Sequence, residues 1–392
     1  MLPTAIEISG FRSFGQERIL LSSLKKLNFF VGQNNSGKSN VLRAITMLSS
    51  IRGSDPRLTP RSSDFAPRVE NICVDLHFPN RALKEVFFRR GGQQNQLLEE
   101  IDERKSFAFP FTVDRNNTTA FTDAQVNHFV ISTGIPEDRF RQFVHQYLGL
   151  GADTLTQARH LLQALGLENY LMNRVLFVPQ IRTVHTINQY VDNVDQFIDS
   201  RHPIVFSGGQ LIDLLFRLQH PPYDARADKL KFNKIIQFLR DITQNETLSL
   251  EVPHDKSSIL VSMDGKTLPL HNLGTGIEEI LIMAAASLGF EDKIVCIEEP
   301  ELHIHPLLQK KLVQLLKQTN NLLLITTHSA SLIDSEAGAI YNVRSVDGLS
   351  EITNPISPSE TLQLFTILAI ARATYCKPIQ SSGWRGRQTG FT

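Results

Sequence analysis

The sequence has few cysteines, no net charge and no long hydrophobic run, so it lacks three features that would otherwise point to a broad class of protein. Its 392 residues include only 3 cysteines, Cys73, Cys296 and Cys376, which lie far apart and show no metal-ligand spacing. Lys plus Arg and Asp plus Glu each number 40, so the formal net charge is zero. A whole-protein basic field that would attract nucleic acid is therefore excluded, whereas a local basic patch is not.

Long hydrophobic runs are also missing. The longest, around Ile280–Phe290 and Leu362–Ala371, are too short to span a bilayer. The start of the chain, Met1–Glu7, has no basic stretch followed by an apolar one, so we expect no signal peptide. These absences predict a cytoplasmic protein, and Cys296, inside an apolar run, fits a buried thiol in a reducing compartment.

A complete phosphate-binding pattern, Gly-x-x-x-x-Gly-Lys-Ser, stands near the N-terminus. An apolar strand predicted at Leu27–Val31 precedes it and an amphipathic helix predicted at Lys38–Ser50 follows, which argues against an ordinary helix-capping turn. In such a loop the backbone N–H groups and the helix N-terminus surround phosphates. Lys38 would reach the outer phosphates, and the Ser39 hydroxyl would bind Mg²⁺. The residues expected to contact the nucleotide are Gly32, Gln33, Asn34, Asn35, Ser36, Gly37, Lys38 and Ser39.

Strands alternate with helices along much of the chain, which predicts an α/β fold whose parallel sheet is covered on both faces. Helices are predicted at Ile277–Leu288 and Leu307–Lys317. The chain divides into an N-terminal lobe (1–184), a helical arm suited to dimer contacts (185–247), a C-terminal lobe (248–372) and an irregular tail (373–392). Besides Leu27–Val31, the predicted strands are Ala5–Ser9, Ile19–Leu21, Val175–Val178, Leu248–Val252, Ile259–Met263, Thr267–Leu270, Ile294–Ile297 and Leu322–Thr326.

Carboxylates follow the apolar strand Ile294–Ile297. Such a strand would place Glu298 and Glu299 at the carboxyl edge of a parallel sheet, where open α/β sheets bind ligands. Glu298 could hold Mg²⁺ through water, and Glu299 could polarise an attacking water. A solvated acidic turn after a core strand is the alternative.

Two further segments carry polar residues at the end of a strand or the start of a helix. The strand Leu322–Thr326 leads to His328, which could contact the terminal phosphate or could simply cap a helix. The segment Asn272–Glu279 is a Gly-rich helix start, and it predicts either a second anion site or an N-cap without a ligand.

The order of these elements resembles that of ABC-type ATPases of the RecF, SMC and OLD (overcoming lysogenization defect) group, from Met1 to about Leu368. The run Glu-Glu-Pro-Glu-Leu-His-Ile-His-Pro at 298–306 is similar to the Walker B motif and D-loop of this group, and it points to the OLD branch. The other matching segments are Ile8–Phe14 (the usual start), Gly32–Ser39 (Walker A), Leu273–Gly276 (signature) and Thr327–Ser329 (switch histidine).

The resemblance implies an ABC-type P-loop ATPase with a mixed sheet, helices on both faces and a helical insertion. It implies ATP and Mg²⁺ as cofactors and a catalytic role for Glu299 and His328. Glu298 stands where many such ATPases have Asp, and Gly274 where they usually have Ser, so that Thr275 would supply any hydroxyl. Metal contacts are expected from Ser39, Glu298 and Gln180, and further nucleotide contacts from Arg12, Asn40, Leu273, Gly274, Thr275 and Gly276.

In this group the signature helix of one subunit completes the ATP site of the other. The resemblance therefore implies a head-to-tail homodimer with two composite sites. OLD nucleases continue into a Toprim domain, and we expect none within these 392 residues. Read in an overlapping frame with a permitted choice of codons, 373–392 spells a strand ending in Val-Glu-Gly-Pro-Ser-Asp, similar to a Toprim start. We hypothesise a frameshift near 366–373, which the nucleotide sequence tests.

Three functions remain open at this stage. The first is the ATPase module of a DNA-processing or phage-defence nuclease, with a separate nuclease or effector as partner. The second is a stand-alone RecF-like or SMC-like DNA repair ATPase, and the third is a nucleotide-gated interaction protein without DNA contact. The loop cluster Arg52, Arg57, Arg61 and Arg68 is either a DNA-backbone contact or a solvated loop.

Overall fold

The computed structural model describes residues 2–48, 60–82, 105–116, 123–148, 174–182, 205–333 and 338–353, and the single positions 102, 156, 158, 159, 184 and 360. The tail 373–392, the first twenty residues of the predicted arm, and Arg52 and Arg57 lie outside these residues. Among the described residues, no helix combines the length and the hydropathy that crossing a membrane requires.

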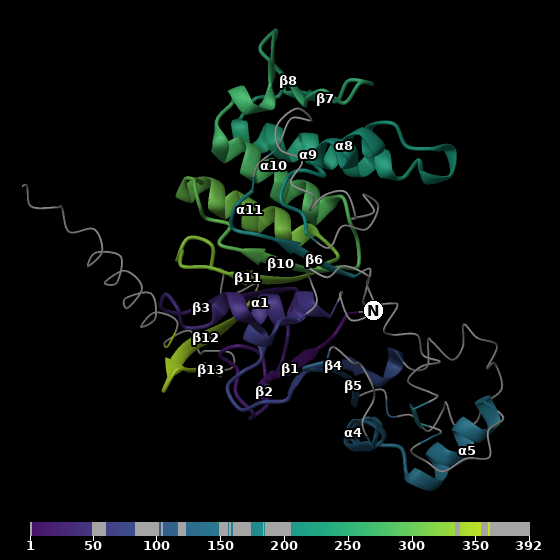
Figure 1. Cartoon of the computed structure of the whole chain (residues 1–392). Coiled ribbons are helices and arrows are strands. Elements are labelled where there is room, and N and C mark those ends of the chain that lie inside the picture. Colours follow the sequence, from purple (N-terminus) through teal and green to yellow (C-terminus); the bar gives the residue numbers. More distant parts are fainter. Residues whose placement is uncertain are drawn as a thin grey trace, which may run out of the picture.

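A six-stranded sheet in the order β13-β12-β3-β11-β10-β6 forms the centre of the molecule (Figure 1). Neighbouring strands from β12 to β6 are parallel, and β13 pairs antiparallel with β12 at the edge. The strands are β3 (Leu27–Val31), β6 (Val175–Val178), β10 (Ile294–Glu298), β11 (Leu322–Thr326), β12 (Gly338–Val346) and β13 (Leu349–Thr353).

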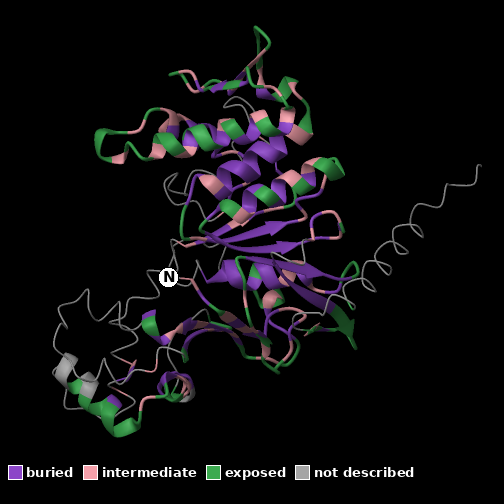
Figure 2. Cartoon of the chain, turned by 180° about the vertical axis from the view of Figure 1, so that it is seen from behind, coloured by how far each residue is buried: buried purple, intermediate pink, exposed green. Residues whose placement is uncertain are grey.

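Helices cover both faces of the central sheet, as its apolar strands require. Helix α1 (Lys38–Met47) covers one face. The opposite face carries α10 (Thr275–Leu288) and α11 (Pro306–Gln318). Successive residues of β3 serve the two cores, since Phe30 packs with the α1 side and Phe29 with the α10 side. The buried strands and helix faces are coloured purple in Figure 2.

Two outer layers complete the described fold. A four-stranded antiparallel sheet, β2-β1-β4-β5, packs against the α1 side, with α4 and α5 beside it. On the other side α8 and α9 pack on α10, and the three-stranded sheet β7-β8-β9 lies beyond. The elements are β1 (Ala5–Ser9), β2 (Ile19–Leu21), β4 (Asn71–Pro79), β5 (Ser106–Asp114), α4 (Asp123–Thr133), α5 (Glu137–Leu148), α8 (Leu211–Gln219), α9 (Asp228–Thr243), β7 (Ser249–Glu251), β8 (Leu260–Met263) and β9 (Lys266–Pro269).

The predicted α/β class is confirmed, and so are most of the predicted elements. The clearest difference is the start of α10, which begins at Thr275 and not at Ile277. Its first turn is more exposed than the rest of the helix, so the apolar pattern marked only the buried part. Gly274, with φ 95°, is therefore the N-cap.

Candidate functional site

The phosphate-binding loop joins β3 to α1, and close packing behind it requires its two glycines. A Cβ on Gly32 would lie 2.1 Å from the carbonyl oxygen of Val343, and one on Gly37 would lie 2.0 Å from Ser350 Oγ. Gly37 also has φ 100°, a conformation that side chains other than glycine rarely adopt. Strands β12 and β13 thus support the loop from behind.

Lys38 is folded back over this loop. Its Nζ donates to the carbonyl oxygens of Gly32 at 3.2 Å and Gln33 at 2.7 Å, and the residue is only 5% exposed. Burial lowers the pKa of Lys38 to about 8, although Glu299 and Glu301 partly oppose this shift. An anionic phosphate would offset the cost of burying this cation. The buried Ser36 Oγ, which has no hydrogen-bond partner among the described residues, also fits a phosphate contact.

Glu298 and Glu299 stand at the carboxyl end of β10, at the same sheet edge as the loop. Glu298 is buried, and its Oε1 lies 3.9 Å from Nε of Arg43 on α1. Glu299 has φ 41°, and its N–H donates to the carbonyl oxygen of Thr326 at 3.0 Å. The backbone therefore turns sharply here and presents two successive carboxylates at this edge.

The side chain of Glu299 meets two of the residues singled out from the sequence. Gln180 Nε2 donates to Glu299 Oε2 at 3.0 Å, and His328 Nε2 lies 3.6 Å from Glu299 Oε1. Burial raises the pKa of Glu299, Glu301 adds to this, and Lys38 opposes it. A carboxylate whose pKa is raised inside a polar cluster is suited to accept a proton.

Glu301 is a site residue that the sequence analysis did not single out. Its Oε1 accepts a hydrogen bond from the backbone N–H of His328 at 2.6 Å, so it fixes the backbone at His328. Its buried Oε2 has no hydrogen-bond partner among the described residues. Its place as the third glutamate of the Glu-Glu-Pro-Glu run is the sequence feature that could have identified it. By contrast, His305 caps α11 through a bond from the Leu307 N–H at 3.3 Å.

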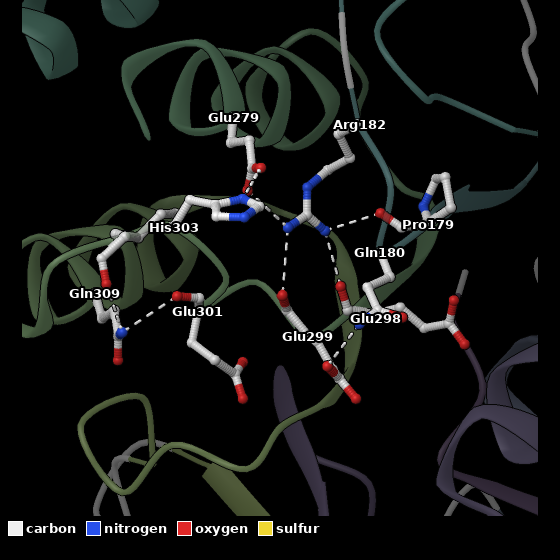
Figure 3. A network of polar contacts seen from close by, with 10 residues as sticks. Pro179, Gln180, Arg182, Glu279, Glu298, Glu299, Glu301, His303 and Gln309 are labelled. Atoms are coloured by element: carbon white, nitrogen blue, oxygen red, sulfur yellow. Dashed lines mark hydrogen bonds and ion pairs between the residues drawn. The ribbon is translucent and has the colours of Figure 1, made fainter. Parts of the chain in front are cut away.

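A buried arginine, Arg182, holds this edge together, as Figure 3 shows. Its guanidinium donates to the carbonyl oxygens of Pro179 and Glu298, each at 2.8 Å, and of Glu299 at 3.2 Å. It also donates to Oε2 of Glu279 on α10 at 3.1 Å. Arg182 therefore links the end of β6, the end of β10 and helix α10. No sequence motif marked it.

Glu279 extends the same network to the segment before α11. Its Oε1 lies 2.7 Å from Nδ1 of His303, and the residue is only 5% exposed (Figure 3). Gly276 lies against this segment too, since a Cβ there would be 2.9 Å from the carbonyl oxygen of His303. The start of α10 thus packs on the segment that follows Glu298 and Glu299.

The segment Leu273–Gly276 differs from the other predicted site segments in its position. It leads into α10, which packs on the face of the central sheet opposite α1. Thr275 and Gly274 are exposed, and a Cβ on Gly274 would meet nothing within 4 Å. A flat, open helix start of this kind leaves room for a ligand or a partner.

Arg12 and Asn40 lie in a layer beside the loop. Arg12 Nε donates to Asp64 Oδ1 at 2.8 Å, and its NH1 donates to Asn40 Oδ1 at 3.4 Å. Asn40 Nδ2 donates to Ser13 Oγ at 2.8 Å. Asn34, Asn35 and Gln33 are exposed at the tip of the loop, and Ser39 is half-buried at the start of α1.

Solved structures with the same fold define the class. The SMC head bound to the C-terminal winged-helix domain of ScpA aligns with 93% of this chain and all of that chain, with a TM-score of 0.54 and 13% identity. The SMC head with a coiled coil and joint derived from Pyrococcus yayanosii aligns over 95% of this chain and 99% of its own, with a TM-score of 0.50 and 12% identity. The chain thus has the fold of SMC head domains, which are P-loop ATPase domains.

The family follows from a second comparison. The model of the family described as "AAA domain, putative AbiEii toxin, Type IV TA system" matches residues 27–334, so the chain belongs to this family. A curated relative, the uncharacterized protein MJ1542 of Methanocaldococcus jannaschii, is 28% identical over 111 residues. That match covers 27% of this chain and only 14% of the relative.

Proposed function

We propose that this protein binds ATP together with Mg²⁺ and hydrolyses it. The observation that carries the proposal is the convergence of Gln180, Glu299 and His328 at the sheet edge that also bears the glycine-lined loop and Lys38. Four neighbouring parallel strands, β3, β11, β10 and β6, end there. Family membership and the SMC-head fold agree with a nucleotide-binding role.

In this proposal Glu299 accepts a proton from the attacking water. The water oxygen then bonds to the γ-phosphorus, the bond from that phosphorus to the bridging oxygen breaks, and ADP leaves with the electron pair. Lys38 offsets the charge on the phosphates, and His328 contacts the terminal phosphate. Gln180 orients Glu299 through the bond to Oε2.

The oxygen donors near the loop suit Mg²⁺, which prefers hard oxygen ligands and keeps several waters. Ser39 would supply a hydroxyl, Glu298 a carboxylate and Gln180 an amide oxygen. The cation would supply charge neutralisation on the phosphates. Among the described residues, the buried carboxylate of Glu298 has Arg43 as its ion-pair partner, at 3.9 Å, so its oxygens could also bind the cation.

The ATP site is proposed to be composite. Helix α10 lies on the opposite face of the sheet from α1, so the segment Leu273–Gly276 would contact the nucleotide of a second copy. A two-fold dimer of this kind closes when ATP binds and opens after hydrolysis. Its wider task is to drive a DNA-processing or phage-defence nuclease, as the OLD-like run at 298–306 indicates.

A second candidate, a nucleotide-gated interaction protein, is favoured by the zero net charge. The SMC head in one matched structure is bound to a winged-helix domain, and the same kind of protein partner would suit this chain. Measuring DNA binding at several salt concentrations, with and without ATP, separates the two candidates. The DNA-processing ATPase should bind DNA in a salt-dependent way, and the interaction protein should not bind DNA.

The direct test is phosphate release from ATP by the wild type, Lys38→Ala and Glu299→Gln. We expect Lys38→Ala to lose ATP binding, whereas Glu299→Gln keeps ATP binding and hydrolyses it about 10²- to 10⁴-fold more slowly. An unchanged rate in Glu299→Gln would show that Glu299 is not the base.

A further inference from the structure

A second cluster of ionisable side chains lies on the outer four-stranded sheet. Glu7 on β1 stands directly opposite Asp75 on β4 in the antiparallel register, so the two carboxylates share one face. Asp75 is only 1% exposed. Two adjacent carboxylates in such a place require compensating positive charge.

Arg18 supplies one part of that charge. Its NH1 contacts Glu7 Oε2 at 3.2 Å and also contacts Asp75 Oδ2. Each carboxylate therefore uses one oxygen for the guanidinium and keeps the other. One positive charge against two negative charges leaves the pair uncompensated.

The imidazole rings of His77 and His128 lie near the carboxylates of Glu7 and Asp75. His77 Nε2 lies 3.2 Å from Glu7 Oε1. One ring nitrogen of His128 on α4 and one oxygen each of Glu7 and Asp75 all lie within 4.8 Å of one another. This spacing matches donor atoms around a single cation.

Unpartnered polar atoms accumulate at this place. Among the described residues, 10 buried side-chain nitrogen or oxygen atoms lack a hydrogen bond of good geometry; Asp75 Oδ1 and His128 Nε2 are among them, as is His77 Nε2, which nevertheless lies 3.2 Å from Glu7 Oε1. Buried polar groups without a partner are costly, and an ion is one standard way to satisfy them. Asp75 Oδ1 and His128 Nε2, for which no partner is seen among the described residues, belong to two of the three residues whose donor atoms lie within 4.8 Å of one another.

We propose that Glu7, Asp75 and His128, with His77 as the fourth ligand, bind one divalent transition metal ion of the Zn²⁺ type. Two imidazole nitrogens and two carboxylate oxygens are a donor set that suits zinc. Arg18 would act as the outer partner that orients both carboxylates, as such groups commonly do at metal sites. The ion would tie β1 and β4 to α4 and so stabilise the outer sheet.

The test uses the full chain without a polyhistidine tag, stripped with chelator and titrated with Zn²⁺ against a competing chelator dye. We expect one Zn²⁺ per chain and a raised melting temperature. His128→Gln and Asp75→Asn should each weaken binding by more than about 100-fold and abolish the thermal shift. A Co²⁺-loaded sample should show the absorption of a tetrahedral site, which both variants should lose.

Two controls make the result specific. His220→Ala with His254→Ala removes a surface pair of imidazole rings 5.2 Å apart and should leave Zn²⁺ binding unchanged. Lys38→Ala should also leave it unchanged, so the outcome does not depend on ATP binding. The proposal is overturned if the wild type binds no Zn²⁺, if His128→Gln and Asp75→Asn still bind it normally, or if the surface pair accounts for it.

Discussion

At the scale of single residues, the site depends on groups whose surroundings alter their chemistry. Burial lowers the pKa of the Lys38 ammonium and raises the pKa of the Glu299 carboxylate. Both shifts weaken the charged form in the nucleotide-free protein. Phosphate would restore the charge of Lys38.

This gives a pH prediction for nucleotide binding. Lys38 has a pKa of about 8 without nucleotide, so below that pH it is protonated and ready to pair with phosphate. Above it, binding must also take up a proton, and the affinity should fall about tenfold per pH unit. The measurement is binding of a fluorescent ATP analogue in EDTA between about pH 7 and pH 9.

The matched control is Lys38→Arg, because a guanidinium stays charged throughout this range. Its affinity should be lower but independent of pH. A wild-type affinity that stays constant up to pH 9 would contradict the assignment of Lys38 as the phosphate-binding cation.

At the scale of elements, Arg182 and Glu279 connect the end of β10 with α10. Both are almost fully buried, and Arg182 spends its donors on three carbonyl oxygens and one carboxylate. Removing either partner alone leaves a buried charge unpaired, which costs about 3–5 kcal/mol. Replacing both by apolar residues removes the unpaired charge, while the three carbonyl oxygens still lose their donors.

We therefore predict a separation of stability from catalysis. Glu279→Gln should lower the melting temperature, and the double variant Arg182→Met with Glu279→Met should recover part of the loss, because no charge is left unpaired although the carbonyl groups lose their donors. The double variant should still show a lower kcat with little change in KM, because the carbonyl groups before and after Glu299 lose their donors. Wild-type kcat in the double variant would refute this positioning role. Glu137→Gln, in the exposed pair with Arg141, is the control.

Much of the element order could be predicted because buried parallel strands read as continuous apolar runs. The bounds of β3, β6 and β11 agree with the prediction for this reason. The contacts that hold the phosphate-binding loop from behind could not be predicted. Ser350 Oγ donates to the carbonyl oxygen of Ser36 at 2.7 Å and lies 2.8 Å from Ser13 Oγ, and no spacing pattern joins segments so far apart. Arg182 was missed for the same reason, since three of its four acceptors are backbone oxygens.

At the scale of the whole molecule, the layers on the two faces of the central sheet decide how the site can be completed. The loop belongs to the α1 side and the segment Leu273–Gly276 to the α10 side. In a single copy these two surfaces lie apart across the sheet. A second copy would bring the start of α10 to the nucleotide.

If ATP drives dimerisation, the mass of the protein in solution should depend on ATP. With ATP and Mg²⁺, Glu299→Gln should elute at about twice the 44.2 kDa of one chain, because slow hydrolysis keeps the dimer closed. Light scattering coupled to gel filtration measures this. Lys38→Ala should remain at the mass it has without ATP, and the same mass for Glu299→Gln with and without ATP would argue against ATP-driven dimerisation.

The most direct test of the composite site pairs two inactive chains. Lys38→Ala removes the loop cation, and Thr275→Arg places a large charged side chain at the start of α10, where Thr275 is exposed. Each variant alone should fail to hydrolyse ATP. Dimers that contain one of each, purified through two different tags, hold one intact site and should show about half of the wild-type rate per dimer. Mixed dimers as inactive as their parents would contradict the composite site.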